Sequence, residues 1–272
     1  MRTSANSFRD RYGPWALIAG GSEGLGASFA ETLASRGLNL ILIARRQEIL
    51  SAFAEQLIQK YHIQVESLVY DLTNGEALFS LIRSCSQKDV GLLVYNAALA
   101  PVGDFLDQPL QEHLNLLNLN CRSAITLAHA FGQRMVERGS GGIILVSSMA
   151  GLQGTAQVAH YAASKAYLKI LGEGLWAELR PRGVDVLTCC AGLTHTPTFL
   201  KGNPTWRGPR ALPVMEPDQV VAETLSALGR KPVVIPGLIN KLASCLTQRL
   251  LPRRLLIELA AAGTRSIYAR SE

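Results

Sequence analysis

The chain has 272 residues, of which 48% are hydrophobic and 18% charged, and this suits one large or two small globular domains. The composition excludes a disordered or collagen-like chain, and no run of about 18 apolar residues predicts a transmembrane helix. The net charge is +6, but the excess lies in residues 230–272, which hold eight Lys or Arg against two acidic residues, so no nucleic-acid-binding surface is predicted.

Short apolar runs alternate with segments of helical periodicity along the chain. The expected strands are 15–20, 38–44, 65–70, 91–96, 142–148, 184–190 and 233–236, and the expected helices are 24–36, 47–60, 75–86, 109–136, 158–180 and 217–229. Nearly continuous apolar strands are typical of a parallel sheet covered on both faces. The alternation therefore predicts an α/β, doubly wound Rossmann fold of about seven strands. We expect one catalytic domain over 1–237 and a basic, amphipathic helical tail over 238–272.

A glycine-rich segment follows the first expected strand and opens the first expected helix. It contains, in order, Gly20, Gly21, Ser22, Glu23, Gly24, Leu25 and Gly26. Glycine permits a tight turn, and backbone N–H groups at a helix N-terminus can hold a pyrophosphate. We interpret the segment as a dinucleotide-binding loop, with a plain tight turn as the alternative.

The ends of the next three expected strands are predicted to lie along the same cofactor. After the second strand, Arg45 and Arg46 stand where an acidic residue would bind the ribose 2′-hydroxyl of NAD. Arginine suits bidentate phosphate contacts, so the sequence favours NADP(H); the alternative is a solvated helix start. After the third strand, Asp71 can contact adenine or cap the following helix. The other residues expected along the cofactor here are Leu72, Asn96, Ala97 and Ala98.

Four polar side chains are predicted to form a reactive cluster. Tyr161 and Lys165 are four residues apart on one expected helix, so they share a face, and an ammonium can lower the pKa of a tyrosine that exchanges protons with a carbonyl or alcohol. Ser148 ends the fifth expected strand, where a hydroxyl can bond the substrate oxygen, and its neighbour Ser147 points to the opposite face. Asn120 lies inside helix 109–136, where asparagine is a middling helix former.

The chain resembles the short-chain dehydrogenase/reductase family in its compact branch, from residue 13 to about 197. Residues 19–26 match the family's TGxxxGxG loop with Ala19 in place of Thr, and residues 95–98 match NNAG with Tyr95 and Ala98 as departures. Asn120, Ser148, Tyr161 and Lys165 fill the family's Asn-Ser-Tyr-Lys tetrad. Residues 191–196 match PGxxxT with Ala191 in place of Pro.

The resemblance implies a role for each of these residues. Tyr161 would be the general acid in carbonyl reduction and the base in alcohol oxidation, and Lys165 would lower its pKa and hold the nicotinamide ribose. Ser148 would stabilise developing oxyanion charge, and Asn120 would hold a water that links Lys165 to a proton relay. The nicotinamide end of the cofactor would be bound by Gly192, Leu193, Thr194 and Thr196.

Two segments are predicted to shape the substrate site. Residues 193–215 form a long, apolar connection that we interpret as a lid over a hydrophobic pocket, with a surface loop as the alternative. The residues expected to contact substrate are Gln153, Phe199, Trp206 and Met215. In the tail, Leu238, Leu242, Leu246 and Leu250 recur every four residues before Pro252. This helix is expected either on an anionic membrane surface or against its own domain or a partner subunit.

The pattern as a whole predicts an NADP(H)-dependent reductase of a hydrophobic ketone, steroid-like or long-chain, working reversibly on the alcohol. The alternatives are a 3-ketoacyl thioester reductase and, from another class, a non-catalytic NADPH sensor or scaffold. A homodimer or homotetramer is expected through helices 109–136 and 158–180. Five cysteines without a CxxC pair predict neither a disulfide framework nor a metal site, and no apolar signal core precedes Gly13, so we expect a cytoplasmic protein.

Overall fold

The computed structural model describes residues 4–201 and 213–268. Its strands are β1 (Trp15–Ala19), β2 (Asn39–Ala44), β3 (Val65–Val69), β4 (Val90–Tyr95), β5 (Gly141–Ser148), β6 (Val184–Ala191) and β7 (Val233–Val234). All neighbouring strands run parallel in one sheet of order β3-β2-β1-β4-β5-β6-β7. The predicted doubly wound sheet of seven strands is therefore confirmed.

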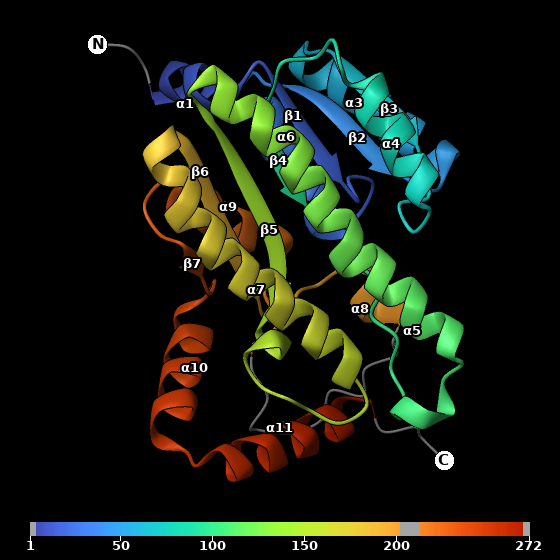
Figure 1. Cartoon of the computed structure of the whole chain (residues 1–272), viewed down its shortest axis with the longest axis vertical. Helices are drawn as coiled ribbons and strands as arrows, with labels where there is room; N and C mark the ends of the chain where they lie inside the picture. Colours follow the sequence, from blue (N-terminus) through green and yellow to red (C-terminus); the bar gives the residue numbers. More distant parts are fainter. Residues whose placement is uncertain (1–3, 202–212, 269–272) are drawn as a thin grey trace.

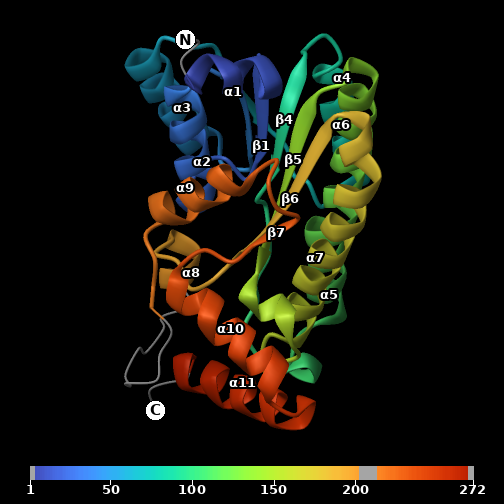
Figure 2. The ribbon, with the colours of Figure 1, turned by 90° about the vertical axis from the view of Figure 1, so that its left-hand side faces the viewer.

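Helices cover both faces of this sheet (Figure 2). The longer helices are α1 (Ser4–Tyr12), α2 (Gly24–Ser35), α3 (Gln47–Tyr61), α4 (Gly75–Ser84), α5 (Leu110–Leu117), α6 (Ala124–Arg138), α7 (Ala159–Leu179), α9 (Pro217–Ala227), α10 (Leu238–Leu250) and α11 (Arg253–Ile267). Short helical turns are η1 (Phe105–Asp107), η2 (Asn118–Ser123), η3 (Met149–Leu152), η4 (Arg180–Arg182) and α8 (Pro197–Lys201). Two large cores result, one between the sheet and α4, α6 and α7, the other between the sheet and α1, α2, α3 and α9.

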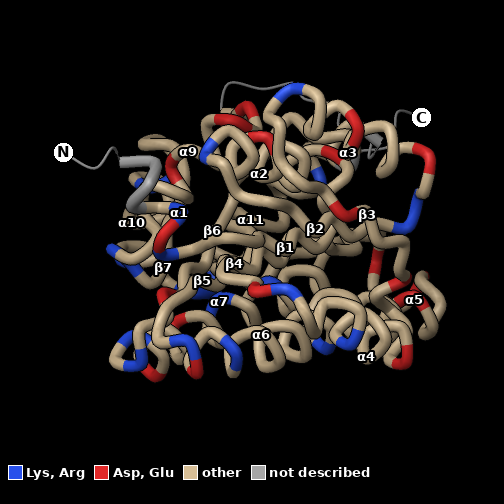
Figure 3. The backbone as a smooth tube through the Cα atoms, turned by 90° about the horizontal axis from the view of Figure 1, so that it is seen from above, with Lys and Arg blue, Asp and Glu red and all other residues tan. Residues whose placement is uncertain are grey.

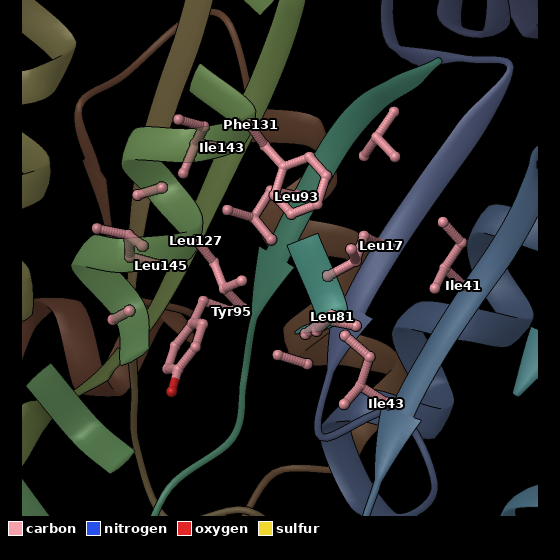
Figure 4. Packing of buried hydrophobic residues seen from close by; sticks show 14 of the residues in the cluster. Leu17, Ile41, Ile43, Leu81, Leu93, Tyr95, Leu127, Phe131, Ile143 and Leu145 are labelled. Atoms are coloured by element: carbon pink, nitrogen blue, oxygen red, sulfur yellow. The ribbon is translucent and has the colours of Figure 1, made fainter. Parts of the chain in front are cut away.

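The first core shows why the central strands are apolar throughout. Leu17, Leu93 and Ile143 extend from β1, β4 and β5 toward Phe131 of α6, and all four are fully buried (Figure 4). Strands buried on both faces carry no solvent-facing positions, so they read as continuous apolar runs. Viewed from above, charged residues gather on the surrounding helices and connections, and β1, β4 and β5 carry none (Figure 3).

Helix α1 was not predicted from the sequence. The rings of its Phe8 and Tyr12 pack in a tilted arrangement with centroids 4.7 Å apart, and buried Tyr12 donates a 2.7 Å hydrogen bond to Asp185 of β6. Arg11 forms a 2.6 Å ion pair with the same carboxylate. The helix is therefore held by tertiary contacts, and its weakly amphipathic sequence alone does not predict it.

The helix expected over 109–136 is divided into α5, the π-helical turn η2 and α6. Ser123 at the end of the turn donates to the carbonyl of Asn118 at 2.8 Å and also to the carbonyl of Leu72. A side chain that takes over backbone acceptors in this way permits a wider turn, and such turns occur at functional sites.

The order of the sheet places the carboxyl ends of β1 and β4 side by side, at the point where successive crossovers change direction. Ala19 pairs with Ile43 of β2 on one side and with Tyr95 of β4 on the other. Ligands of open α/β sheets bind outside such a switch point. The tail helices α10 and α11 lie beyond the same end of the sheet (Figure 1).

Candidate active site

The glycine loop after β1 makes close backbone contacts that no larger residue would permit. Gly20 has φ +78°, and a Cβ there would lie 2.9 Å from the backbone of Ala97. A Cβ on Gly26 would lie 1.8 Å from the carbonyl oxygen of Gly20. The side-chain amide of Asn96 donates to that same oxygen at 2.9 Å. Asn96 and Ala97 therefore fix the conformation of the loop through these contacts.

The start of α2 and the end of β2 present hydrogen-bond donors beside the glycine loop. Helix α2 begins at Gly24, and its N-cap residue, Glu23, makes no side-chain cap hydrogen bond. Uncapped N–H groups at a helix start attract a phosphate. Arg45 and Arg46 are exposed beside the loop, and Arg46 forms an ion pair with Glu23. These residues fit a nicotinamide dinucleotide cofactor.

The residues after β3 form a hydrogen-bonded turn that leads into α4. Asp71 accepts hydrogen bonds from the N–H of Thr73 at 2.9 Å and from its hydroxyl at 2.8 Å. The cap of α4 is made by Asn74 and not by Asp71, because the Asn74 side chain accepts from two N–H groups of the first turn. The side chain of Leu72 is buried in the core, and its carbonyl accepts a hydrogen bond from the hydroxyl of Ser123.

The end of β5 and the first turns of α7 bring the reactive side chains together. Ser148 lies at the strand end, and its hydroxyl accepts from the N–H of Ala150 at 3.1 Å. Its neighbour Ser147 is buried and donates to the carbonyl of Lys165 at 2.6 Å, so it faces α7 and not the site. The Nζ of Lys165 lies 5.6 Å from the ring centroid of Tyr161.

Burial has the largest effect on the proton affinities of this pair. It raises the pKa of Tyr161 to about 12, an effect that a hydrogen bond with Ser148 partly offsets and that nearby Tyr268 reinforces. Burial lowers the pKa of Lys165 to about 8. The Lys165 ammonium donates to the carbonyl of Val146 at 2.8 Å, and burial has the largest effect on the pKa of Tyr161.

Asn120 is fully buried in the π-helical turn and is engaged on both sides of its amide. Its Oδ1 accepts from the N–H of Leu99 at 2.8 Å. Its Nδ2 donates to the carbonyl of Leu99 at 2.9 Å and to the hydroxyl of Ser164 at 2.9 Å. The side chain thus joins the segment after β4 to α7, which gives a physical reason for asparagine at this point.

The segment after β6 lies against the glycine loop. A Cβ on Gly24 would be 3.0 Å from the side chain of Thr196, whose hydroxyl accepts from the N–H of Phe199 at 3.3 Å. Thr194 donates to the carbonyl of Gly192 at 3.0 Å and pairs with Met215 in a short bridge. Leu193 accepts from the N–H of Met215 at 2.9 Å.

The predicted substrate residues fall in different surroundings. Gln153 is half-buried and directly follows η3, close in sequence to Ser148, and Phe199 is half-buried on α8. Met215 is buried in a small core with Val220, so it supports the wall of the site. Trp206 lies outside the described residues.

The tail meets the site through residues that sequence reasoning missed. Thr264 of α11 lies 2.8 Å, hydroxyl to hydroxyl, from Thr155, which is in the connection between Ser148 and α7. Tyr268, just after α11, is close enough to Tyr161 to raise its pKa. No local pattern signals these contacts, because they join segments more than a hundred residues apart.

The leucine stripe of α10 faces away from the domain. Leu238, Leu242, Leu246 and Leu250 are all exposed, whereas Asn240 and Ser244 are buried against the body of the protein. Asn240 donates to the carbonyl of Pro236 at 3.0 Å. The helix therefore packs on its own domain through its polar face.

A second missed cluster lies beside Tyr161. His160, its neighbour in the chain, has its Nδ1 3.2 Å from the Nδ1 of His113 on α5. The Nε2 of His113 lies 2.9 Å from the carbonyl oxygen of Phe105. The rings of His113 and Phe105 stack with their centroids 4.2 Å apart. Because a carbonyl only accepts, Nε2 of His113 carries a proton, and the pair joins η1 and α5 to the start of α7.

In residues 4–201 and 213–268, no group of three His, Cys, Asp or Glu side chains is arranged to hold a metal ion. None of the helices in the described part of the chain combines the length and the apolarity that crossing a bilayer requires.

Several known proteins have sequences related to this chain. The model of the short chain dehydrogenase family matches residues 14–205. A 7beta-hydroxysteroid dehydrogenase from Clostridium sardiniense is 32% identical over 86% of this chain and 90% of its own length. The inactive hydroxysteroid dehydrogenase-like protein 1 of Homo sapiens is 36% identical over 65% of this chain and 54% of its own length.

Solved structures agree with the fold over nearly the whole chain. A structure from a study of 7beta-hydroxysteroid dehydrogenase stereoselectivity has a TM-score of 0.87 at 27% identity and covers 93% of this chain and 98% of its own. A short-chain dehydrogenase from Sphingobium yanoikuyae in complex with NADPH has a TM-score of 0.76 at 30% identity, covering 88% of this chain and 96% of its own.

Proposed function

The chain belongs to the short-chain dehydrogenase family and is an oxidoreductase, and on this premise we propose that it reduces a hydrophobic ketone with NADPH and oxidises the corresponding alcohol with NADP⁺. The observation that carries the proposal is the convergence of Ser148, Tyr161 and Lys165 at the strand ends next to the glycine loop. Each of the three has the chemistry that a carbonyl oxygen needs as it becomes an alcohol.

The proton in this reaction comes from Tyr161. With a pKa raised to about 12 the phenol is protonated at neutral pH, so it can donate its hydroxyl proton to the carbonyl oxygen. The hydroxyl of Ser148 donates a hydrogen bond to the same oxygen while negative charge develops on it. When bound, the reduced nicotinamide supplies the hydride.

Lys165 acts on the tyrosine after the proton has left. Its ammonium is buried and donates to the carbonyl of Val146. Opposite charges attract strongly in a site that excludes water, so the ammonium stabilises the phenolate of Tyr161 as it forms. Asn120 contributes as a positioning residue, because its side chain fixes Leu99 and Ser164 on either side of the site.

The preference for NADP(H) rests on charge at the end of β2. Arg45 and Arg46 are both exposed there, and no acidic residue occupies the position that would bind a ribose 2′-hydroxyl. The related structure in complex with NADPH supports the same cofactor class.

The substrate class follows from the apolar surroundings and from the relatives. Phe199 of α8 and the tail helix α11 stand beyond the strand ends, so a bulky apolar ketone would be enclosed by both. Relatives named 7beta-hydroxysteroid dehydrogenase make a steroid-like ketone the first candidate. Exposed apolar residues on α5, α6 and α7 support assembly into a homodimer or homotetramer; these are Leu114, Leu117, Ile125 and Ile170.

A non-catalytic role is the second candidate, because one group of relatives is named inactive. The complete set of Ser148, Tyr161 and Lys165 in this chain favours catalysis, since binding a cofactor alone does not require a proton donor. The two roles differ in whether any ketone is turned over.

The proposal is tested by following oxidation of NADPH and of NADH with a panel of carbonyl compounds. The panel contains steroid ketones, long-chain ketones, 3-ketoacyl thioesters and small polar carbonyls. We expect turnover with steroid-like or long-chain ketones and with NADPH in preference to NADH. Turnover only of thioesters would support the alternative reductase, and binding of NADPH without turnover of any compound would support the sensor or scaffold.

A further inference from the structure

We propose that Glu23 sets how strongly the protein discriminates between NADP(H) and NAD(H), because its carboxylate competes with the 2′-phosphate for Arg46. This inference rests on the proposed NADP(H) cofactor. It assigns to a residue of the glycine loop a role in specificity that is separate from the shape of the loop.

The contact joins two adjacent strand ends. Ala19 of β1 pairs with Ile43 of β2, so the residues that follow each strand emerge side by side. Glu23 is the N-cap residue of α2, and Arg46 is the N-cap residue of α3. The Nη2 of Arg46 contacts the Oε2 of Glu23 directly.

The arginine that this pairing occupies is one of the two that would bind a 2′-phosphate. Among the residues that the structure describes, Arg46 forms its ion pair with Glu23, whereas Arg45 forms none. A guanidinium that bonds a carboxylate through one edge has fewer donors for a phosphate. The cofactor must therefore displace Glu23 or share Arg46 with it, and the second anion is repelled by the first.

The pairing is weak enough to be displaced. The side chains of Arg46 and Glu23 are 47% and 32% exposed, so water screens their attraction. Exposed pairs of this kind alter an equilibrium by about two- to fivefold, and removing the repulsion between carboxylate and phosphate adds to this. We therefore expect loss of the Glu23 charge to tighten binding of 2′-phosphorylated ligands by about two- to tenfold.

The carboxylate of Glu23 has no competing structural duty in α2. It makes no side-chain cap hydrogen bond, so the helix start does not depend on it. The substitution Glu23→Gln keeps the size and polarity of the side chain and removes only its charge. Glu31 provides a matched control, because it lies on the same helix and forms a 3.6 Å ion pair with Lys60.

The experiment measures binding by isothermal titration calorimetry for the full-length protein and the variants Glu23→Gln and Glu31→Gln. The probes are NADP⁺ and 2′,5′-ADP, which carry the 2′-phosphate, and NAD⁺ and 5′-AMP, which do not. We expect Glu23→Gln to tighten both 2′-phosphorylated probes by about two- to tenfold and to change the other two by less than twofold. Glu31→Gln should leave all four unchanged.

A second set of variants assigns the effect to Arg46. In a protein that carries Arg46→Met, the further change Glu23→Gln should tighten NADP⁺ by less than it does beside the native arginine. Unchanged or weaker binding of NADP⁺ to Glu23→Gln overturns the inference, as does equal tightening of NADP⁺ and NAD⁺. If the unmutated protein binds NADP⁺ no more tightly than NAD⁺, the proposed cofactor itself is wrong; if it prefers NADP⁺ and Glu23→Gln has no effect, only the role of Glu23 is wrong.

Discussion

Replacing Asn120 with alanine should destabilise the protein and weaken catalysis together. The native side chain is fully buried and makes three hydrogen bonds, two to the backbone of Leu99 and one to Ser164. Each lost bond costs about 0.5–1.5 kcal/mol, and the half-buried backbone of Leu99 can recover part of this with water, so the free energy of unfolding should fall by about 2 kcal/mol.

Chemical denaturation of Asn120→Ala and of the control Asn115→Ala measures this loss. Asn115 lies one and a half turns earlier, is half-exposed and accepts a single 3.0 Å bond from Gln111, so its loss should change stability by about 0.5 kcal/mol or less. In a cycle with Ser164→Ala, the coupling to Asn120 should be about 1 kcal/mol. A variant that keeps full stability and loses only turnover would refute the positioning role and favour a water held by Asn120.

Four other consequences follow from the geometry of the site. In Gly26→Ala the new Cβ would lie 1.8 Å from the carbonyl oxygen of Gly20, so calorimetry should show NADP⁺ binding weakened by about tenfold or more, whereas Gly174→Ala, which meets no atom within 4 Å, should raise stability by up to about 1 kcal/mol. Because burial lowers the pKa of Lys165 to about 8, the initial rate of carbonyl reduction should fall as pH rises through that value; a rate that is flat to the ordinary pKa of lysine would contradict this. Between about pH 8 and the ordinary lysine pKa of 10.5, Lys165 carries a proton in the unfolded chain but not in the folded protein. The free energy of unfolding of the native protein should therefore rise with pH in this range relative to that of Lys165→Met. In Thr264→Val the 2.8 Å contact with Thr155 is lost, so hydrogen exchange of α11 should quicken by about two- to tenfold and KM for a bulky ketone should rise more than KM for a small one; equal changes in both KM values would show that α11 does not enclose the substrate.

The fold could be read from the sequence because its local and global preferences agree. Continuous apolar runs such as that of β4 have few ways to be buried except between two layers of helix, and the glycines of residues 20–26 mark where the chain turns. The choice of Ser148 over Ser147 follows from the alternation of side chains along a strand, and the structure places the two hydroxyls on different partners.

The features that the sequence did not reveal depend on distant contacts. Helix α1 is held by Asp185, more than 170 residues later, and the surroundings of Tyr161 include Tyr268 from the tail. The sequence predicted an amphipathic helix over α10, but the polar residues Asn240 and Ser244 face the domain while the leucines face outward. Periodicity locates the faces of a helix, and only the packed structure shows which face is covered.

Proton affinities were also beyond the reach of the sequence. A tyrosine four residues from a lysine suggests a lowered tyrosine pKa, yet burial raises the pKa of Tyr161 to about 12. The Lys165 ammonium is directed to the carbonyl of Val146. Spacing along a helix shows that two side chains share a face, but it does not fix the direction of their charged ends.

The most direct test of the account compares Tyr161→Phe with the native protein in two assays on the same sample. The first follows NADPH oxidation with a ketone that the native protein reduces, and the second measures NADPH binding by calorimetry. The account predicts that turnover falls by at least about a hundredfold while NADPH affinity changes little, because the variant loses only the proton donor. Turnover that survives in Tyr161→Phe would show that another group donates the proton and would contradict the central claim.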